Sequence, residues 1–215
     1  AAQTEVSEST RTATFTPGRD AARKEASKLN VPRIGVRFRL PASMNQVEYF
    51  GRGPAENYLD RNAGSMVGLY KSTAEELYFP YVRPQENGHH TDTRWVSLST
   101  GKKGLLIQAD NTIGFNALRN SIEDFDDEEA TGLSRQWSNF TPEQVANHDE
   151  AAAKNVLRRQ HHINDITPRD FVEVCVDLKQ QGVAGYDSWG SRPEPAYTLP
   201  ANREYNWGFT LIPLK

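Results

Sequence analysis

Apolar and polar residues alternate at every second position in several short runs of this chain, and this period limits the fold more than any other feature. Successive side chains on a β-strand point to opposite faces, so each such run predicts a strand with one buried face. Two runs flank a turn at 99–103, which is typical of a hairpin. The predicted strands cover 34–40, 46–51, 95–98, 104–108, 113–118, 172–178 and 205–211.

Helical signals are scarce by comparison. Thr141 and Pro142 provide a helix start with a cap and a proline in the first turn, and an alanine-rich run continues to Ala153. Many short strands, little helix and 12 prolines predict an all-β chain that folds as a large antiparallel β-sandwich. We expect residues 1–30, which have few large apolar groups, to be a poorly anchored lead-in to a sandwich domain at 31–215.

Composition excludes several classes of function. The net charge of −3 argues against a nucleic-acid partner, and no apolar run is long enough to span a membrane. The single cysteine, Cys175, excludes an internal disulfide and a cysteine-based zinc site. No signal peptide is visible, but this does not indicate a compartment, so none is predicted.

No catalytic residue is predicted within the chain. Most carboxylates lie in turns or in the acidic segment 122–130, which is typical of a solvated surface. The alternation places Glu173 and Asp177 on the solvent-facing side of their strand, where burial would not raise a carboxyl pKa. No Gly-x-Ser-x-Gly elbow or phosphate-binding glycine loop occurs.

Four histidines form two adjacent pairs, His89 with His90 and His161 with His162. Neighbouring side chains on a strand point to opposite faces, so such a pair rarely binds one ion. No His-x-His or His-Glu-x-x-His spacing is present, and no metal site is predicted. The roles of the four histidines stay open.

Trp189 lies among Gly185, Gly190 and Pro193, a setting typical of an exposed loop. An exposed indole beside polar groups can pack on the apolar face of a sugar ring. The alternative is a tryptophan that closes the edge of the sandwich, and the residues alone favour neither. The default interpretation of Trp95, Trp137 and Trp207 is core packing.

Three segments, taken in order, resemble one family. Residues 49–61 read Tyr-Phe-Gly-Arg-Gly-Pro-Ala-Glu-Asn-Tyr-Leu-Asp-Arg, residues 81–88 read Tyr-Val-Arg-Pro-Gln-Glu-Asn-Gly and lead into Thr-Arg-Trp at 93–95, and residues 187–189 read Asp-Ser-Trp. Their order and spacing are similar to those of the C-terminal small-chain domain of LacZ-type β-galactosidases, in glycoside hydrolase family 2. The resemblance covers about residues 31–215.

The resemblance implies a galactose mutarotase-like β-sandwich, truncated here on its N-terminal side. It also implies that the catalytic glutamates and the magnesium ligands lie in a separate TIM barrel upstream, so we expect no cofactor and no activity in this chain alone. The expected partners are a galactoside and that barrel in the same parent protein, with homo-oligomerisation of the parent left open. The Asp-Ser-Trp loop would line the subsite of the leaving sugar, which implies substrate-binding roles for Asp187, Ser188 and Trp189.

Three other functions are compatible with the residues. A free-standing carbohydrate-binding module would also use Trp189. An aldose mutarotase would need a general acid and base, for which His89 or His161 with Glu173 can be imagined. An oligomerisation domain would need no sugar contact.

Overall fold

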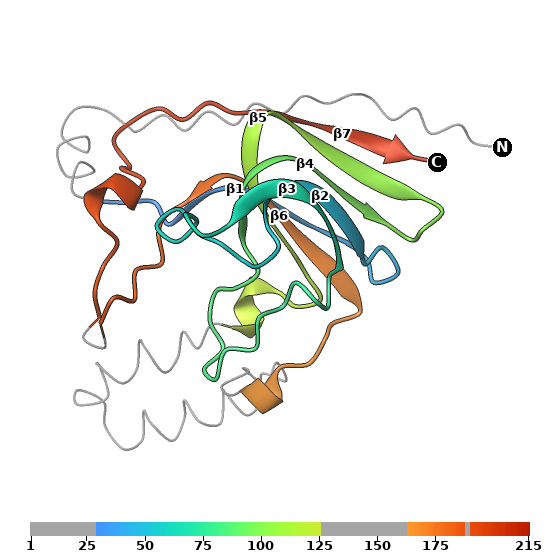
Figure 1. Cartoon of the computed structure of the whole chain (residues 1–215), viewed down its shortest axis with the longest axis horizontal. Helices are drawn as coiled ribbons and strands as arrows, with labels where there is room; N and C mark the ends of the chain where they lie inside the picture. Colours follow the sequence, from blue (N-terminus) through green and yellow to red (C-terminus); the bar gives the residue numbers. More distant parts are fainter. Residues whose placement is uncertain (1–28, 126–162, 188–189) are drawn as a thin grey trace, which may run out of the picture. The chain divides into compact units, whose positions relative to one another are not determined.

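A computed structural model describes residues 29–125, 163–187 and 190–215 of the chain (Figure 1). These residues separate into two compact units. The larger unit contains all the strands that the structure describes and comprises the described parts of 1–79, 87–119 and 170–215. The smaller unit comprises the described parts of 80–86 and 120–169. No described helix is long and apolar enough to cross a membrane.

The larger unit is built on one antiparallel sheet, and its regular structure is almost entirely β. The expected all-β, antiparallel fold is therefore confirmed. The order of strands along the sheet is β1-β6-β5-β4-β2-β3, and β7 pairs with β5. The strands are β1 (Arg33–Pro41), β2 (Gln46–Gly53), β3 (Met66–Thr73), β4 (His90–Ser99), β5 (Gly104–Leu118), β6 (Phe171–Gln180) and β7 (Phe209–Leu214).

Strand β5 connects two parts of the sheet. Residues 104–109 pair with β7, and residues 114–118 pair with β6, while β4 lies along the other side of β5 (Figure 1). The sequence predicted two separate strands here, and the structure joins them into one of 15 residues. The predicted hairpin between β4 and β5 is confirmed.

Strand β6 is buried on both of its faces. One face is apolar, because Val172, Val174 and Val176 pack beside Phe115 and Ala117 of β5, all of them fully buried. This face matches the alternation seen in the sequence. It extends across the sheet to buried apolar residues of β2, β4 and β5, namely Val47, Tyr49, Val96, Leu98 and Ile107.

The second face of β6 is polar and yet buried, which corrects the prediction that Glu173 and Asp177 face solvent. Glu173 is 3% exposed and Asp177 is 0% exposed. Arg39 and Arg37 from β1 lie over Glu173, with nitrogen–oxygen distances of 2.9 Å and 3.5 Å. Alternation specifies which face a side chain lies on, but the covering of that face comes from long side chains on a neighbouring strand and from loops.

Two further strand predictions were incomplete. Strand β3 was not predicted, because it lies at the sheet edge and exposes Met66, Val67 and Leu69, so no burial period marks it. The run 205–211 becomes a strand only from Phe209 onwards. The Tyr205 hydroxyl instead donates to the carbonyl of Pro200 at 2.8 Å, which holds that end of the run in a loop.

In the smaller unit, the acidic segment begins with a short 3-10 helix, η1 (Ile122–Asp124), capped by Ser121. Asp124 is buried and accepts hydrogen bonds from Arg169, with its Oδ2 lying 3.0 Å from Arg169 Nε. Burial acts to raise the pKa of Asp124, but the hydrogen bonds from Arg169 and Ser121 outweigh it and lower the pKa. Residues 1–28 of the lead-in predicted at 1–30, the helix at 141–153 and His161 with His162 lie outside the described residues.

Candidate functional site

The loop that carries the predicted sugar-binding residues leaves the end of β6. Its first residues are held by backbone hydrogen bonds: the Gln181 amide donates to the Pro32 carbonyl at 2.9 Å, and the Gly182 amide donates to the Tyr197 carbonyl at 2.8 Å. Farther along, the loop turns outward, and Tyr186 is 59% exposed. Gly185 and Gly190 adopt positive φ angles of 89° and 82°, which only glycine adopts readily.

Asp187 is exposed on this loop. Its Oδ1 accepts a hydrogen bond from the Ser191 amide at 3.3 Å, and the Ser191 hydroxyl accepts one from the Tyr186 amide at 3.0 Å. These contacts join Tyr186 and Asp187 to Ser191. Ser188 and Trp189 lie outside the described residues, so their sugar-binding roles stay predictions.

The base of this loop is held by Asp60, a residue to which the sequence assigned no role. Asp60 Oδ1 accepts a hydrogen bond from the Val183 amide at 3.1 Å, and Oδ2 accepts one from the Ala184 amide at 2.8 Å. Asp60 belongs to the first family-like segment, 49–61, and Asp187 belongs to the third. The carboxylate thus joins two motifs that lie more than 120 residues apart, with a separation of 123 between Asp60 and Val183.

The segment before Asp60 is a compact turn that begins where β2 ends at Gly53, so Gly51 and Gly53 themselves belong to the strand. The Gly53–Pro54 peptide bond is cis. Tyr58 and Arg61 exchange backbone hydrogen bonds, so that Asp60 projects from a closed turn. The Arg61 guanidinium lies over the Tyr58 ring and also bonds Glu56 at 2.7 Å.

The first segment is fastened through Asn57, which is fully buried, to the residues that directly follow the second segment. Asn57 Oδ1 accepts hydrogen bonds from the Thr91 backbone amide at 2.9 Å and the Thr91 hydroxyl at 2.6 Å. The backbone amide of Asn57 donates to the His89 carbonyl at 2.7 Å. Glu56 Oε2 accepts from the Gly88 amide at 2.6 Å. Residues 56–57 and 88–91 therefore form one hydrogen-bonded group within the larger unit, and Glu56 and Asn57 have structural partners in it.

Beneath this group lies a buried polar cluster, formed by Arg33, His89, Asn116 and Asp177. The Tyr58 ring stacks on His89, with 5.6 Å between ring centroids. His89 Nδ1 lies 2.7 Å from Asn116 Oδ1, which also accepts from Arg33 at 2.7 Å. Because Asn116 Oδ1 can only accept, Nδ1 of His89 carries the proton in this contact.

The electrostatics of the cluster keep His89 uncharged. Burial lowers its pKa to about 3, the positive charge of Arg33 acts in the same direction, and the hydrogen bond to Asn116 opposes them. Burial likewise lowers the pKa of His90. His89 and Glu173 are both buried, so the pair imagined for mutarotase chemistry does not face a substrate in this structure.

Among the described residues, no group of three or more histidine, cysteine or acidic side chains is arranged to hold a metal ion. The geometry described above instead supports an exposed loop on a rigid base. The fold and the loop together define a domain of the β-sandwich class. It presents an exposed loop whose base is hydrogen-bonded to Asp60.

The chain belongs to the β-galactosidase small chain family, whose model matches residues 3–211. A β-galactosidase of Priestia megaterium is 35% identical over 185 residues, which are 86% of this chain and 15% of that protein. A β-galactosidase of Arthrobacter sp. is 40% identical over 111 residues, 49% of this chain and 11% of that protein. A third, from Vibrio cholerae, is 29% identical over 181 residues, 84% of this chain and 14% of that protein. The chain thus spans only 11% to 15% of the length of these three relatives.

Proposed function

We propose that this chain is the small-chain domain of a β-galactosidase that hydrolyses terminal β-galactosides, and that it shapes the sugar site without supplying catalytic carboxylates. The catalytic glutamates and the magnesium ion would belong to a barrel in the same parent protein. This domain would contribute the loop residues Asp187, Ser188 and Trp189 to the subsite of the leaving sugar.

One observation supports the domain role above all others. Asp60 of the first motif binds the backbone at Val183 and Ala184, the base of the loop that carries the third motif. Gly88, the last residue of the second motif, bonds Glu56 of the first, and Thr91 bonds Asn57. The first motif, itself held by residues 88–91, thus supports the base of the loop that carries the third motif, which is the arrangement that a preorganised binding loop requires.

The leaving-sugar role is tested by Trp189→Ala in the full-length protein. We expect the KM for lactose to rise about tenfold, as loss of one aromatic packing surface predicts, while kcat falls less. Trp189→Phe keeps an aromatic ring and should recover part of the loss. A wild-type KM in the alanine variant would contradict the proposal and favour a structural tryptophan.

The non-catalytic role is tested on the purified chain by itself. We expect no turnover of a chromogenic β-galactoside, because the buried Glu173 and Asp177 bind arginines and cannot act as an acid–base pair on a sugar. Turnover that copurifies with the chain and disappears in a Glu173→Gln variant would overturn this part of the proposal.

A further inference from the structure

We infer that Asp60 is a positioning residue for the leaving-sugar subsite, acting through the backbone of the loop that follows β6. The inference rests on the proposed function of that loop. Asp60 itself touches no substrate. Its carboxylate would fix the path of the chain from Gly182 to Ala184, and so the base of the loop on which Asp187 lies.

Both carboxylate oxygens are used for this purpose. Oδ1 lies 3.1 Å from the Val183 amide nitrogen, and Oδ2 lies 2.8 Å from the Ala184 amide nitrogen. A charged acceptor bonds backbone amides about twice as strongly as a neutral one. Two consecutive amides on one carboxylate also fix the orientation of the peptide unit between them, which a single hydrogen bond would not.

The backbone at this point departs from its preferred conformation. Ala184 has a φ of 54°, in the left-handed region, which an alanine adopts at a cost of about 1 kcal/mol. Such a conformation persists only where the surroundings hold it. The hydrogen bond from the Ala184 amide to Asp60 Oδ2 provides that restraint.

Gly182 shows how closely the loop approaches the carboxylate. A Cβ at Gly182 would lie 2.4 Å from Asp60 Cγ and 2.4 Å from Oδ2. No side chain fits at this distance, so the glycine allows the contact between loop and carboxylate to form. Asp60 and Gly182 therefore act as a matched pair, one supplying the acceptor and the other the space.

Asp60 can do this because its own position is rigid. It lies in the turn closed by the hydrogen bonds between Tyr58 and Arg61. Tyr58 is 1% exposed, and Asn57 next to it is fully buried and bonded to Thr91. The loop is thus tied to the core of the larger unit rather than to another surface segment.

The first experiment measures the restraint itself in the full-length protein. Amide hydrogen exchange should show protection of Val183 and Ala184 in the wild type, and at least a tenfold faster exchange in Asp60→Ala. Asp60→Asn keeps one carbonyl acceptor and should give an intermediate rate. Unchanged exchange at both amides in Asp60→Ala would overturn the inference, whatever the activity of the enzyme.

The second experiment connects the restraint to the subsite by steady-state kinetics on lactose. Asp60→Ala should raise KM severalfold with a smaller change in kcat, and Asp60→Asn should recover part of it. A purely structural role would reduce the amount of active enzyme, lowering kcat at constant KM, and that result would overturn the inference. Asp60→Ala combined with Trp189→Ala should raise KM by less than the product of the single effects.

A double-mutant cycle separates this inference from the proposed function. Gly182→Ala should raise KM in the wild type, and by a smaller factor in Asp60→Ala, where the two closest atoms are gone. If Trp189→Ala raises KM while Asp60→Ala does not, the inference fails and the proposed function stands. If Trp189→Ala leaves KM unchanged, the proposed function fails.

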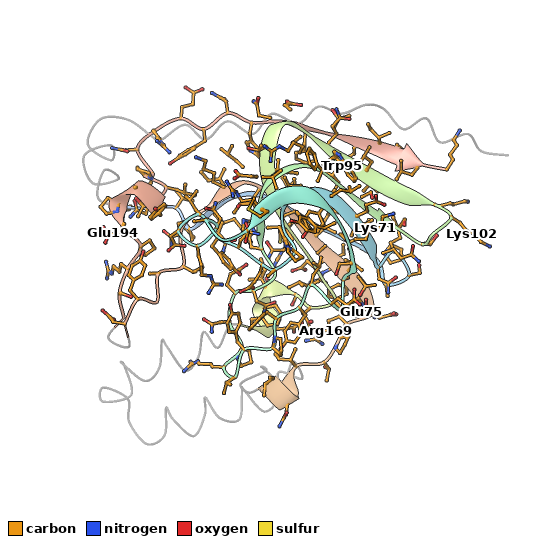
Figure 2. The ribbon with its side chains drawn as sticks, in the orientation of Figure 1. Lys71, Glu75, Trp95, Lys102, Arg169 and Glu194 are labelled. Atoms are coloured by element: carbon orange, nitrogen blue, oxygen red, sulfur yellow. The ribbon has the colours of Figure 1, made fainter. Side chains whose placement is uncertain are left out.

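Glu75 supplies the matched control. It is a carboxylate of the same unit that bonds Arg119 at 2.6 Å. Figure 2 shows Glu75 far across the view from Glu194, which lies on the chain just beyond the loop. Glu75→Gln should leave both the exchange of Val183 and Ala184 and the KM for lactose at wild-type values. A rise in KM equal to that of Asp60→Ala would count against a specific role for Asp60.

Discussion

Nε of Arg33 lies 3.1 Å from Oδ2 of Asp177, a carboxylate with no exposure to solvent, on the neighbouring strands β1 and β6. In the register of the sheet, glycines flank Asp177 on both sides, Gly35 on β1 and Gly114 on β5. Gly35 leaves room for the carboxylate of Asp177, and Gly114 leaves room for the neighbouring ring of His89. The pair is therefore a point at which single substitutions should have large effects.

Removal of one partner should strongly destabilise the chain. Arg33→Met leaves a buried carboxylate without its cation, for which we expect a loss of about 3–5 kcal/mol in the free energy of unfolding. Chemical denaturation measures this loss in the free energy of unfolding. Lys71→Met is the control, because Lys71 pairs with Glu48 at 3.3 Å while 75% exposed, and its loss should be below about 1 kcal/mol (Figure 2). Equal losses in the two variants would contradict this prediction.

A methyl group at Gly35 should also be costly. Its Cβ would lie 2.0 Å from Asp177 Oδ1 and 2.6 Å from the Val176 carbonyl oxygen, so the strands or the carboxylate must shift. We expect Gly35→Ala to lower the free energy of unfolding by about 1–3 kcal/mol, as overpacking does. Gly64→Ala is the matched control, since a Cβ there meets nothing within 4 Å. An unchanged free energy of unfolding in Gly35→Ala would show that the polar cluster can shift to make room for the methyl group.

Stability should fall as the pH drops from neutral towards 3, because of His89. Its pKa in the folded chain is lowered to about 3, so between that value and the ordinary 6.5 the unfolded chain binds a proton that the folded chain does not. The free energy of unfolding therefore decreases by up to about 1.4 kcal/mol per pH unit in this window for this group. His89→Asn, denatured at pH 7, 6 and 5, should show a shallower slope than wild type, whereas an unchanged slope would argue against a neutral buried His89.

The hydrogen bonds of the buried Asn57 side chain should be a major source of stability. Asn57→Ala removes hydrogen bonds to Thr91 and to the carbonyls of Arg52 and Ala55, and it leaves buried groups without partners. We expect a loss of about 2–4 kcal/mol, since each unsatisfied buried group costs about 1–3 kcal/mol. The exposed Asn206, which bonds Glu204, is the control, and Asn206→Ala should change the unfolding free energy by less than about 0.5 kcal/mol.

The alternation in the sequence predicted β1, β2, β4, β5 and β6, because β2, β4, β5 and β6 bury apolar residues on one face and β1 alternates half-buried with exposed side chains. It missed β3, whose Met66 and Leu69 are exposed at the sheet edge. It also placed Glu173 and Asp177 in solvent, because a period of two says nothing about what covers each face. The arginines that cover them come from β1, more than 130 residues earlier, with a separation of 134 between Arg39 and Glu173.

The candidate site shows the same limit. Asp187 was identified from a motif, and its exposed position on the loop follows from the glycines around it. Asp60 was present in a motif too, yet its partners are backbone amides at Val183 and Ala184. Backbone groups carry no residue identity, so no pattern of side chains could indicate that contact in advance.

The two-sided pairing of β5 has a consequence for the chain during its synthesis. Ala109 on β5 pairs with Phe209 on β7, and the ribosome adds the intervening residues at about 5–20 per second. The edge of β5 that β7 later covers is therefore open for about 5–20 s in a nascent chain that already contains β4 and β5. An open strand edge pairs readily with strands of other chains. Crowded polysomes and slow codons between residues 110 and 209 should therefore favour aggregation. Slower translation of this stretch should lower the yield of folded protein.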